Sequence, residues 1–305
     1  MSSFVIDERT AVGPVRLTVA DLGRSLSFYE GVLGMRGARQ PDGDYALSVG
    51  GPALLSLEER RGARPKPQRS TGLYHVAILM PTRADLARVI ARLAEARYPL
   101  TGASDHLVSE ALYLDDPDGN GLEIYADRPR AAWPKAGDEV RMTVDPLDIE
   151  AILGELDSAS GPWAGLPAGT TIGHVHLHVA DLRAAEEFYV GVLGFEVMQR
   201  FGNSALFVAA GGYHHHLGLN IWAGVGAPPP PADAVGLRHY AVRLPDQAAL
   251  DAVLGRVRAA GLPVEEAGAG LFVRDPSQNV VLLALANDGI IGESEHAPAA
   301  TAARR

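Results

Sequence analysis

The chain of 305 residues contains no cysteine. Thiol catalysis, disulfide bonds, cysteine-ligated zinc and iron–sulfur clusters are therefore excluded. It also lacks a run of about eighteen apolar residues, which excludes a transmembrane helix, and its amino-terminal segment Met1–Thr10 lacks the apolar core of a secretory signal. We expect a cytoplasmic globular protein whose chemistry uses His, Asp, Glu, Tyr or a metal that these residues bind.

Positive charge is also scarce. The net charge is −10, and no basic run is longer than two residues, as at Arg304-Arg305 at the end of the chain. Electrostatic attraction to nucleic acid or to an anionic membrane is therefore not expected. The length suits two domains of about 150 residues each.

The sequence repeats itself after about 160 residues. Two short motifs, Val-Ala-Asp-Leu and Gly-Val-Leu-Gly, occur once in each half in the same order. Their positions are Val19–Leu22 with Val179–Leu182, and Gly31–Gly34 with Gly191–Gly194. A duplication of this kind predicts two halves with the same fold.

Each half divides again into two smaller units. In the first unit, an alternating strand at Val15–Val19 precedes Asp21, a good helix N-cap, and a helix and three strands follow. The same βαβββ pattern begins again near Leu73, Ile172 and Leu237. The expected fold class is therefore α+β, with four βαβββ modules in two domains.

The domain boundaries follow from these modules. We expect one domain at residues 11–127 and a second at 171–287. The connector 128–170 is punctuated by Pro and Gly and contains one expected helix, Asp148–Leu156. Residues 288–305 are expected to form a disordered tail, since Ala297–Arg305 in particular is small and polar.

Histidines recur at the first strands of the modules. His75 and His174 each begin such a strand, and His239 lies in the corresponding strand of the fourth module. A lone histidine is usually a surface residue or a hydrogen-bonded core residue. Recurrence at equivalent places in repeated units instead favours a shared role.

Glu123 lies in the expected last strand of the second module, Leu122–Ala126, on the face opposite Leu122 and Ile124. A carboxylate in a short apolar strand is costly to bury unless it is paired or bound to a metal. Two imidazoles and one carboxylate leave open positions on Fe(II), as in non-heme oxygenases. Histidines and Glu123 together therefore predict a metal site.

The pattern of these residues and modules resembles that of the vicinal oxygen chelate superfamily, which contains glyoxalases, extradiol dioxygenases and bleomycin-resistance proteins. The resemblance covers all four modules. A narrower match to the extradiol ring-cleavage pattern lies in the second module and departs from that pattern only at Ser104, two residues before its histidine. Its matching residues are His106, Tyr113, the turn Asp116–Gly119 and Glu123. Within the superfamily, the chain is most similar to two-domain bacterial catechol 2,3-dioxygenases.

The resemblance implies glyoxalase-like domains whose curved mixed sheets form open barrels. It also implies Fe(II)-dependent ring cleavage of catechol or another aromatic diol with O2. His75 and Glu123 match metal-ligand positions, and Tyr113 and His106 match residues that steer the substrate oxygens. Open sheets of this kind often associate, so a homodimer is also expected.

The remaining ligand position of the family lies in the first strand of a partner module. In the first module this position is Pro14, which cannot ligate a metal, and in the third it is His174. The family usually pairs its third and fourth modules, but here Leu282 replaces the carboxylate of the fourth. We therefore expect His174 to join His75 and Glu123 in one metal site, within one chain or across a dimer.

The run His214–His216 falls where the resemblance places an acid–base histidine, in the last strand of the third module. Strand alternation would put His215 on one face and its two neighbours on the other. Alignment on Gly218 favours His215 and alignment on Trp222 favours His216, so both are catalytic candidates. His176 and His178 share the face of His174 and are either packing residues or contacts to metal or substrate.

Two other functions fit the same family. A glyoxalase-type isomerase or lyase would bind Mn(II), Ni(II) or Zn(II) with the same ligands. It would also need a second carboxylate ligand, but the last strand of the third module offers histidines and Asn220 instead. A bleomycin-resistance-like binding protein would need no metal. The complete His, His, Glu set and the Tyr113–His106 pair favour the dioxygenase.

Overall fold

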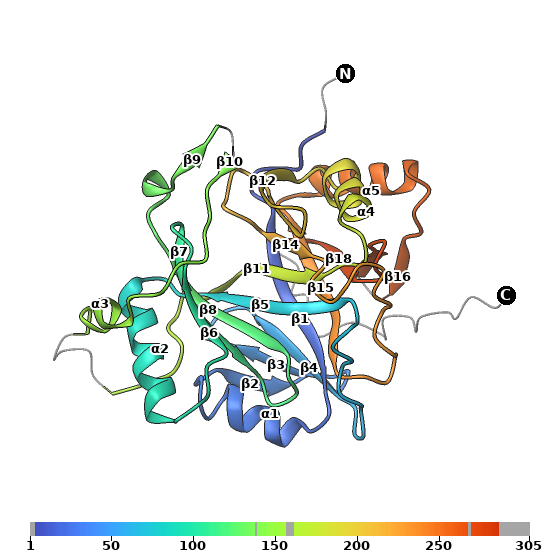
Figure 1. The fold of residues 1–305 in the computed structure, drawn as a ribbon. Coiled ribbons are helices and arrows are strands. Elements are labelled where there is room, and N and C mark those ends of the chain that lie inside the picture. The colour runs from blue at the N-terminus through green and yellow to red at the C-terminus, as the bar shows by residue number, and fades with distance from the viewer. Residues whose placement is uncertain (1–3, 138, 157–161, 268–269, 287–305) are drawn as a thin grey trace.

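Two eight-stranded mixed sheets form the centre of the computed structural model, which describes residues 4–137, 139–156, 162–267 and 270–286 (Figure 1). In spatial order, the first sheet contains β16 (Glu265–Ala267), β17 (Gly270–Arg274), β18 (Val280–Leu285), β15 (Gly236–Leu244), β1 (Ala11–Val19), β4 (Leu55–Glu59), β3 (Tyr45–Ser48) and β2 (Arg36–Arg39). The second contains β12 (Glu196–Phe201), β13 (Ala205–Ala209), β14 (Leu217–Asn220), β11 (Thr171–His178), β5 (Gly72–Leu79), β8 (Gly121–Asp127), β7 (Ser109–Asp115) and β6 (Gly102–Asp105).

Each sheet joins modules from both halves of the sequence. The first and fourth modules meet where β1 pairs antiparallel with β15, and the second and third meet where β5 pairs antiparallel with β11. Neither half of the chain therefore forms a sheet of its own. The α+β fold of four βαβββ modules with curved mixed sheets is confirmed.

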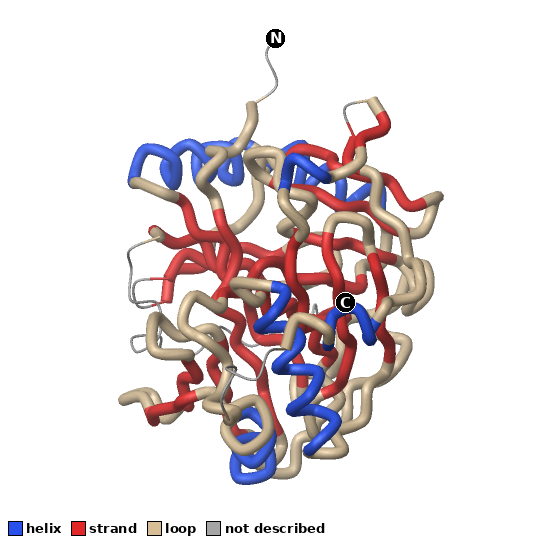
Figure 2. Tube along the Cα trace, turned by 90° about the vertical axis from the view of Figure 1, so that its left-hand side faces the viewer, coloured by secondary structure: helices blue, strands red, loops and turns tan. Residues whose placement is uncertain are grey.

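Helices cover the outside of this strand-rich interior (Figure 2). They are α1 (Leu22–Tyr29), α2 (Arg83–Glu95), α4 (Leu182–Glu186) with the π-helical turn η2 (Glu187–Val192), and α5 (Gln247–Ala259). The expected N-cap Asp21 accepts a hydrogen bond from the backbone N–H of Arg24, and Asp181 does the same for Ala184 in the second half. Among the described residues, no helix is both long enough and apolar enough to cross a membrane.

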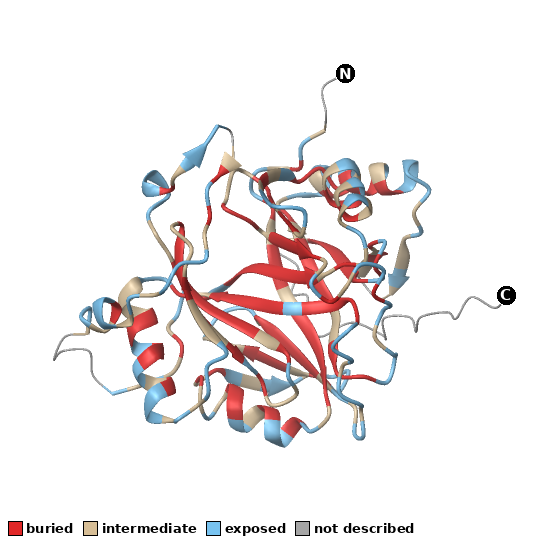
Figure 3. Ribbon diagram, in the orientation of Figure 1, coloured by how far each residue is buried: buried red, intermediate tan, exposed pale blue. Residues whose placement is uncertain are grey.

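The main core lies between the helices and the sheets, and buried residues follow the central strands (Figure 3). The repeated Phe-Tyr pair contributes to it and also makes a polar contact. The Tyr29 hydroxyl donates to Asp116 at 3.0 Å, and the Tyr189 hydroxyl donates to Asp275 at 3.0 Å. Because Asp116 begins the turn into β8, this contact fixes the strand that carries Glu123.

Some elements differ from the sequence-based expectations. The position of β2, the first of the three strands expected after the helix, was not located, because β2 lies at a sheet edge and its sequence Arg-Gly-Ala-Arg shows no apolar alternation. The connector contains the 3₁₀ turn η1 (Arg130–Ala132), the short strands β9 (Lys135–Ala136) and β10 (Glu139–Val140), and the helix α3 (Ile149–Leu153). The last is shorter than the expected Asp148–Leu156, because Asp148 is its N-cap and Gly154 its C-cap. The expected tail at 288–305 lies outside the described residues.

Candidate metal centre and active site

Strand register brings the three expected ligands together at Ala77 in the second sheet. The antiparallel pairing of β5 with β11 sets Ala77 against His174, and the parallel pairing of β5 with β8 sets it against Glu123. His75 lies two residues before Ala77 and therefore on the same face. The intervening Val76 points to the opposite side and belongs to the helix-covered core.

The three side chains converge within a single chain. Glu123 Oε2 lies 3.0 Å from His75 Nε2 and 3.0 Å from His174 Nε2. One ligand atom from each residue lies within 4.8 Å of the other two, and all three residues are at most 5% exposed. Among the described residues, this is the one group of three or more potential metal ligands.

The donor set fits a divalent metal ion. Burial lowers the pKa of His174 to about 4, so its ring is neutral near pH 7. Burial alone would raise the pKa of Glu123, but its interactions with His174 and, to a smaller extent, with His75 hold that pKa well below its usual value. Neutral imidazole and ionised carboxylate are the forms that bind metals. His75 Nε2 is also buried without a hydrogen bond of normal geometry, which leaves its lone pair available to an ion.

A cavity of about 500 Å³ opens beside these ligands. Its lining includes His75, Glu123, His176 and His215, and among its described lining residues there is no lysine or arginine. Apolar and aromatic side chains form much of the remaining wall, including Tyr74, Val108, Met142, Phe201, Phe207 and Trp222. This combination suits a small planar ring with few charges.

Tyr113 and His106 form a hydrogen-bonded pair in the wall of the cavity. His106 Nδ1 lies 2.6 Å from the carbonyl oxygen of Thr143, and His106 Nε2 lies 2.6 Å from the Tyr113 hydroxyl. Because a carbonyl only accepts, Nδ1 carries the proton of a neutral His106, and the Tyr113 hydroxyl donates to Nε2. Burial, followed by the charge of Glu123, raises the pKa of Tyr113 well above its usual value, so the phenol stays protonated.

The surroundings of the histidine run distinguish between His215 and His216, the two candidates for the acid–base residue. It lies in the segment before β14 rather than within the expected strand, so strand alternation does not govern it. His215 lines the cavity and stacks on His174 with ring centroids 4.0 Å apart. His216 instead accepts a hydrogen bond from the backbone N–H of Ala210 and does not line the cavity. The geometry therefore favours His215.

His214 connects this segment to the end of β8. Its Nε2 lies 2.9 Å from Asp127 Oδ1, and its Nδ1 lies 2.8 Å from His215 Nδ1. The second oxygen of Asp127 accepts a hydrogen bond of 2.9 Å from the Tyr213 hydroxyl. Asp127 was not predicted as a site residue, although it lies four residues after Glu123 and so shares its face of the strand.

The connector also contributes to the site, which its sequence did not indicate. Met142, Thr143 and Val144 line the cavity, and the Thr143 carbonyl orients His106. Backbone hydrogen bonds between Asp105 and Asp145 join the connector to β6 next to His106. A carbonyl contact of this kind leaves no side-chain pattern by which it could be predicted.

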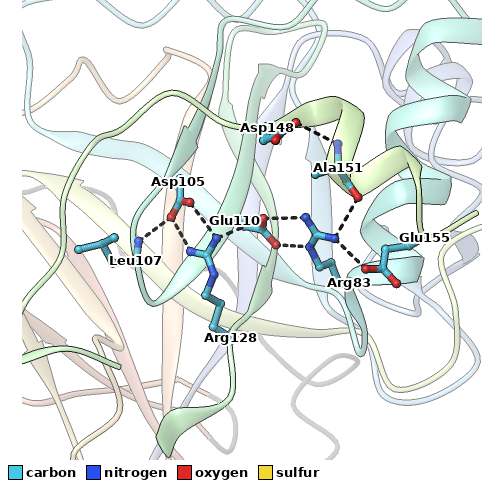
Figure 4. A network of polar contacts seen from close by, with 8 residues as sticks. All are labelled: Arg83, Asp105, Leu107, Glu110, Arg128, Asp148, Ala151 and Glu155. Atoms are coloured by element: carbon cyan, nitrogen blue, oxygen red, sulfur yellow. Dashed lines mark hydrogen bonds and ion pairs between the residues drawn. The ribbon is translucent and has the colours of Figure 1, made fainter. Parts of the chain in front are cut away.

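A polar network beside His106 strengthens this attachment (Figure 4). Asp105 accepts a hydrogen bond of 2.8 Å from Arg128, which also contacts Glu110 at 3.2 Å. Glu110 in turn accepts a hydrogen bond of 2.6 Å from Arg83, whose guanidinium reaches the last turn of α3. The network thus links β6, β7, β8 and α2 to the connector that closes the cavity.

The remaining histidines have other partners. His176 lines the cavity, and its Nε2 accepts a hydrogen bond of 3.0 Å from the Asn220 amide. His178 lies 2.7 Å from the other end of that amide and does not line the cavity. Both ends of the Asn220 amide therefore contact histidines. Asn220 carries an amide and not a carboxylate, so it cannot be the second carboxylate that a glyoxalase-type site needs.

The first sheet shows what the same positions become without ligands. Ala241 of β15 pairs with Leu282 of β18, just as Ala77 pairs with Glu123. Leu282 belongs to a small apolar cluster there, and His239 is buried with its Nδ1 unpaired among the described residues. This face of the first sheet therefore carries an apolar side chain where the second sheet has the carboxylate of Glu123.

The fold and the site define the class of protein. Residues 11–124 and 171–283 match the family model of the Glyoxalase/Bleomycin resistance protein/Dioxygenase superfamily. These segments span well over half of the chain, and the chain belongs to this superfamily.

Individual relatives narrow the comparison. A protein named Catechol-2,3-dioxygenase from Bacillus subtilis (strain 168) is 50% identical over 276 residues, which cover 89% of this chain and 95% of that protein. A solved structure from Bacillus subtilis subsp. subtilis str. 168 shares the fold with a TM-score of 0.65 at 17% identity, covering 96% of this chain and 89% of its own. Glyoxalase I from Zea mays also shares the fold, with a TM-score of 0.53 at 17% identity and coverages of 90% and 92%.

Proposed function

We propose that the protein is an iron-dependent extradiol dioxygenase that cleaves the ring of catechol or a substituted catechol with O2. The observation that carries this proposal is the convergence of His75, Glu123 and His174 beside a cavity that also holds His215 and Tyr113. The 50% identity to a protein named Catechol-2,3-dioxygenase supports it.

Fe(II) is the ion that best suits the proposed reaction. Two imidazoles and one carboxylate are the donor set of non-heme iron oxygenases. A divalent iron ion bound by His75, Glu123 and His174 would supply Lewis acidity and open coordination positions for a chelating diol and for O2. The same three donors also accept Mn(II), Ni(II) or Zn(II), so metal analysis belongs in the test.

His215 is the proposed general base. Burial lowers the pKa of His215 well below its usual value, so the ring is neutral and can take a proton from a substrate hydroxyl. It would return that proton as the ring opens. Because His215 stacks on His174 and lies against Phe207 at a centroid distance of 4.9 Å, its ring is held in one orientation.

Tyr113 is the proposed partner of the other substrate oxygen. Its proton is committed to His106, so its phenolic oxygen is free to accept a hydrogen bond from a substrate hydroxyl. His106 contacts Tyr113 and the Thr143 carbonyl and acts by orienting the phenol.

The cavity favours an uncharged ring. Its described lining offers no lysine or arginine, and it contains the carboxylates of Glu123 and Asp115. A carboxylate on the substrate would be desolvated without a cationic partner. We therefore propose catechol and alkyl-substituted or aryl-substituted catechols as the substrate class.

The test is anaerobic purification and iron analysis, followed by addition of catechol and then O2. The proposal predicts about one iron per chain, O2 consumption and a yellow ring-fission product. Turnover of an α-ketoaldehyde–thiol adduct with another divalent metal would favour the glyoxalase-type function. Tight binding of a ligand without any metal would favour the bleomycin-resistance-like function. The cytoplasmic location and the homodimer stay predictions from the sequence, which cell fractionation and light scattering would test.

A further inference from the structure

A chain of three side chains leads from the end of β8 to the cavity. Asp127 Oδ1 contacts His214 Nε2 at 2.9 Å, and His214 Nδ1 contacts His215 Nδ1 at 2.8 Å. His214 is completely buried, so water does not compete for either of its nitrogens. His215 lines the cavity at the other end of the chain.

The partners determine where the protons lie. A carboxylate oxygen only accepts hydrogen bonds, so a neutral His214 carries its proton on Nε2 and donates it to Asp127. Its Nδ1 then has a lone pair and can only accept. The short contact between the two rings therefore requires the proton of His215 to lie on Nδ1. A neutral His215 with that proton has a free lone pair on Nε2.

We propose that Asp127 and His214 are positioning residues that fix His215 as the Nδ1–H tautomer, with Nε2 ready to accept a proton. The assignment of the substrate hydroxyl as the proton donor rests on the proposed function, but the tautomer does not. The neutral side chain of a free histidine favours the Nε2–H tautomer, so the Nδ1–H form of His215 has to be imposed by its surroundings. The carboxylate of Asp127 imposes it through His214.

The surroundings of Asp127 hold its carboxylate in place for this task. Its Oδ2 accepts from the Tyr213 hydroxyl at 2.9 Å, and Tyr213 contacts the Tyr125 hydroxyl at 2.8 Å. The Tyr213 ring also packs on His214 with centroids 4.1 Å apart. One carboxylate oxygen is thus occupied by a phenol, and the other is directed at His214.

The first experiment reads the tautomer directly in metal-free protein. The ¹⁵N shifts of labelled histidine distinguish a protonated from an unprotonated ring nitrogen, and the H215Q variant assigns the signals of His215. Wild-type protein should show Nδ1 protonated and Nε2 unprotonated. In D127L, His214 loses its acceptor and should move its proton to Nδ1, which would drive the proton of His215 to Nε2.

Three further variants guard against a simple folding defect. Y213F removes a hydrogen bond from the same carboxylate but leaves its contact with His214, so the tautomer of His215 should not change. H214Q keeps a side-chain carbonyl that can accept from His215, whereas H214F removes the acceptor. The tautomer should therefore survive in H214Q and be lost in H214F, even if D127L does not fold.

Kinetics on the iron-loaded protein give the functional result. D127L should lower kcat by about 100-fold or more, the usual contribution of a general base, with iron content and KM for catechol little changed. H214Q should recover most of the activity that H214F loses. A wild-type His215 protonated on Nε2, or a D127L variant with an unchanged tautomer, would overturn the inference. A tautomer that shifts as expected in a protein without dioxygenase activity would support the inference and count against the proposed function.

Discussion

Replacement of Glu123 by Gln should lower the stability of the metal-free protein and also remove the stabilisation that a bound metal ion gives. The substitution keeps the shape of the side chain but removes its charge. Glu123 is 2% exposed and lies 3.0 Å from both His75 Nε2 and His174 Nε2. Without a metal, the carboxylate is a buried charge between two rings, and with a metal it is a ligand.

The expected loss in metal-free stability follows from these contacts. The fold holds the pKa of Glu123 well below its usual value, so it favours the ionised carboxylate over a neutral group of the same shape. Only the contact of Glu123 with His174 has the geometry of a hydrogen bond, since His75 Nε2 is unpaired. A hydrogen bond to a charged group contributes about 1.5–3 kcal/mol, so we expect E123Q to destabilise the metal-free protein by about 1–3 kcal/mol. With an unfolding entropy of about 2.1 cal/mol/K per residue, this lowers Tm by about 2–5 °C.

The same variant should lose the metal. Substitution of residues that merely support a ligand already weakens metal binding by about 10–100-fold, so loss of a ligand carboxylate should exceed about 100-fold, or about 2.7 kcal/mol. The assay is thermal unfolding under anaerobic conditions with and without Fe(II), together with O2 consumption. Wild-type protein should gain stability from the ion, and E123Q should not.

A matched control is available at the equivalent position of the first sheet. L282A removes a buried side chain without touching the metal site, so it should destabilise the protein yet keep iron binding and turnover. An E123Q protein with full iron and full activity would refute the ligand assignment. A metal-free E123Q protein that is more stable than wild type would refute the energetic reasoning.

The remaining predictions concern the phenol, the substrate and the pH. Y113F loses its hydrogen bond to His106, so kcat should fall by about 10-fold or more with iron content retained, and unchanged steady-state kinetics would exclude the role of Tyr113. A carboxylated catechol should react with a kcat/KM at least about tenfold below that of catechol, because its carboxylate would lose water without a cationic partner in the cavity. A desolvation cost of about 1.4 kcal/mol corresponds to that tenfold difference. Equal kcat/KM values would contradict the uncharged substrate class. Burial lowers the pKa of His239 to about 3, so the unfolded chain binds more protons between pH 6.5 and 3 and stability falls as the pH falls through that range. Lowering the pH from neutral to 5 should therefore reduce the free energy of unfolding by about 2 kcal/mol through this one group. In H239L, the same change of pH should reduce the free energy of unfolding, measured by urea denaturation, by about 2 kcal/mol less. Parallel pH profiles for the two proteins would disprove this role of His239.

The duplicated sequence was sufficient to predict the modules and the three candidate ligands. Repeats locate each first strand, and a carboxylate in an apolar strand is conspicuous because it needs a partner. The association of the middle modules followed from elimination among the ligand positions that the family resemblance implies, because Pro14 and Leu282 remove the alternatives. The register that brings His174 and Glu123 to either side of Ala77 became visible only in the structure.

Other parts of the site could not be predicted for physical reasons. The sequence left the choice between His215 and His216 open, because alignment on Gly218 and alignment on Trp222 favoured different residues. The run also lies in an irregular segment, where strand alternation does not apply. The carbonyl of Thr143 orients His106 through backbone atoms that every residue shares. Asp127 was predictable in principle, because alternation from Glu123 places it on the same face of β8.

The location of the bound iron tests the central claim most directly. Anomalous diffraction at the iron edge, measured on crystals of anaerobically iron-loaded protein, locates the ion without reference to activity. We predict one strong peak per chain, within bonding distance of His75 Nε2, His174 Nε2 and a carboxylate oxygen of Glu123, all from the same chain. A peak elsewhere, or one whose ligands come from two different chains, would contradict the account.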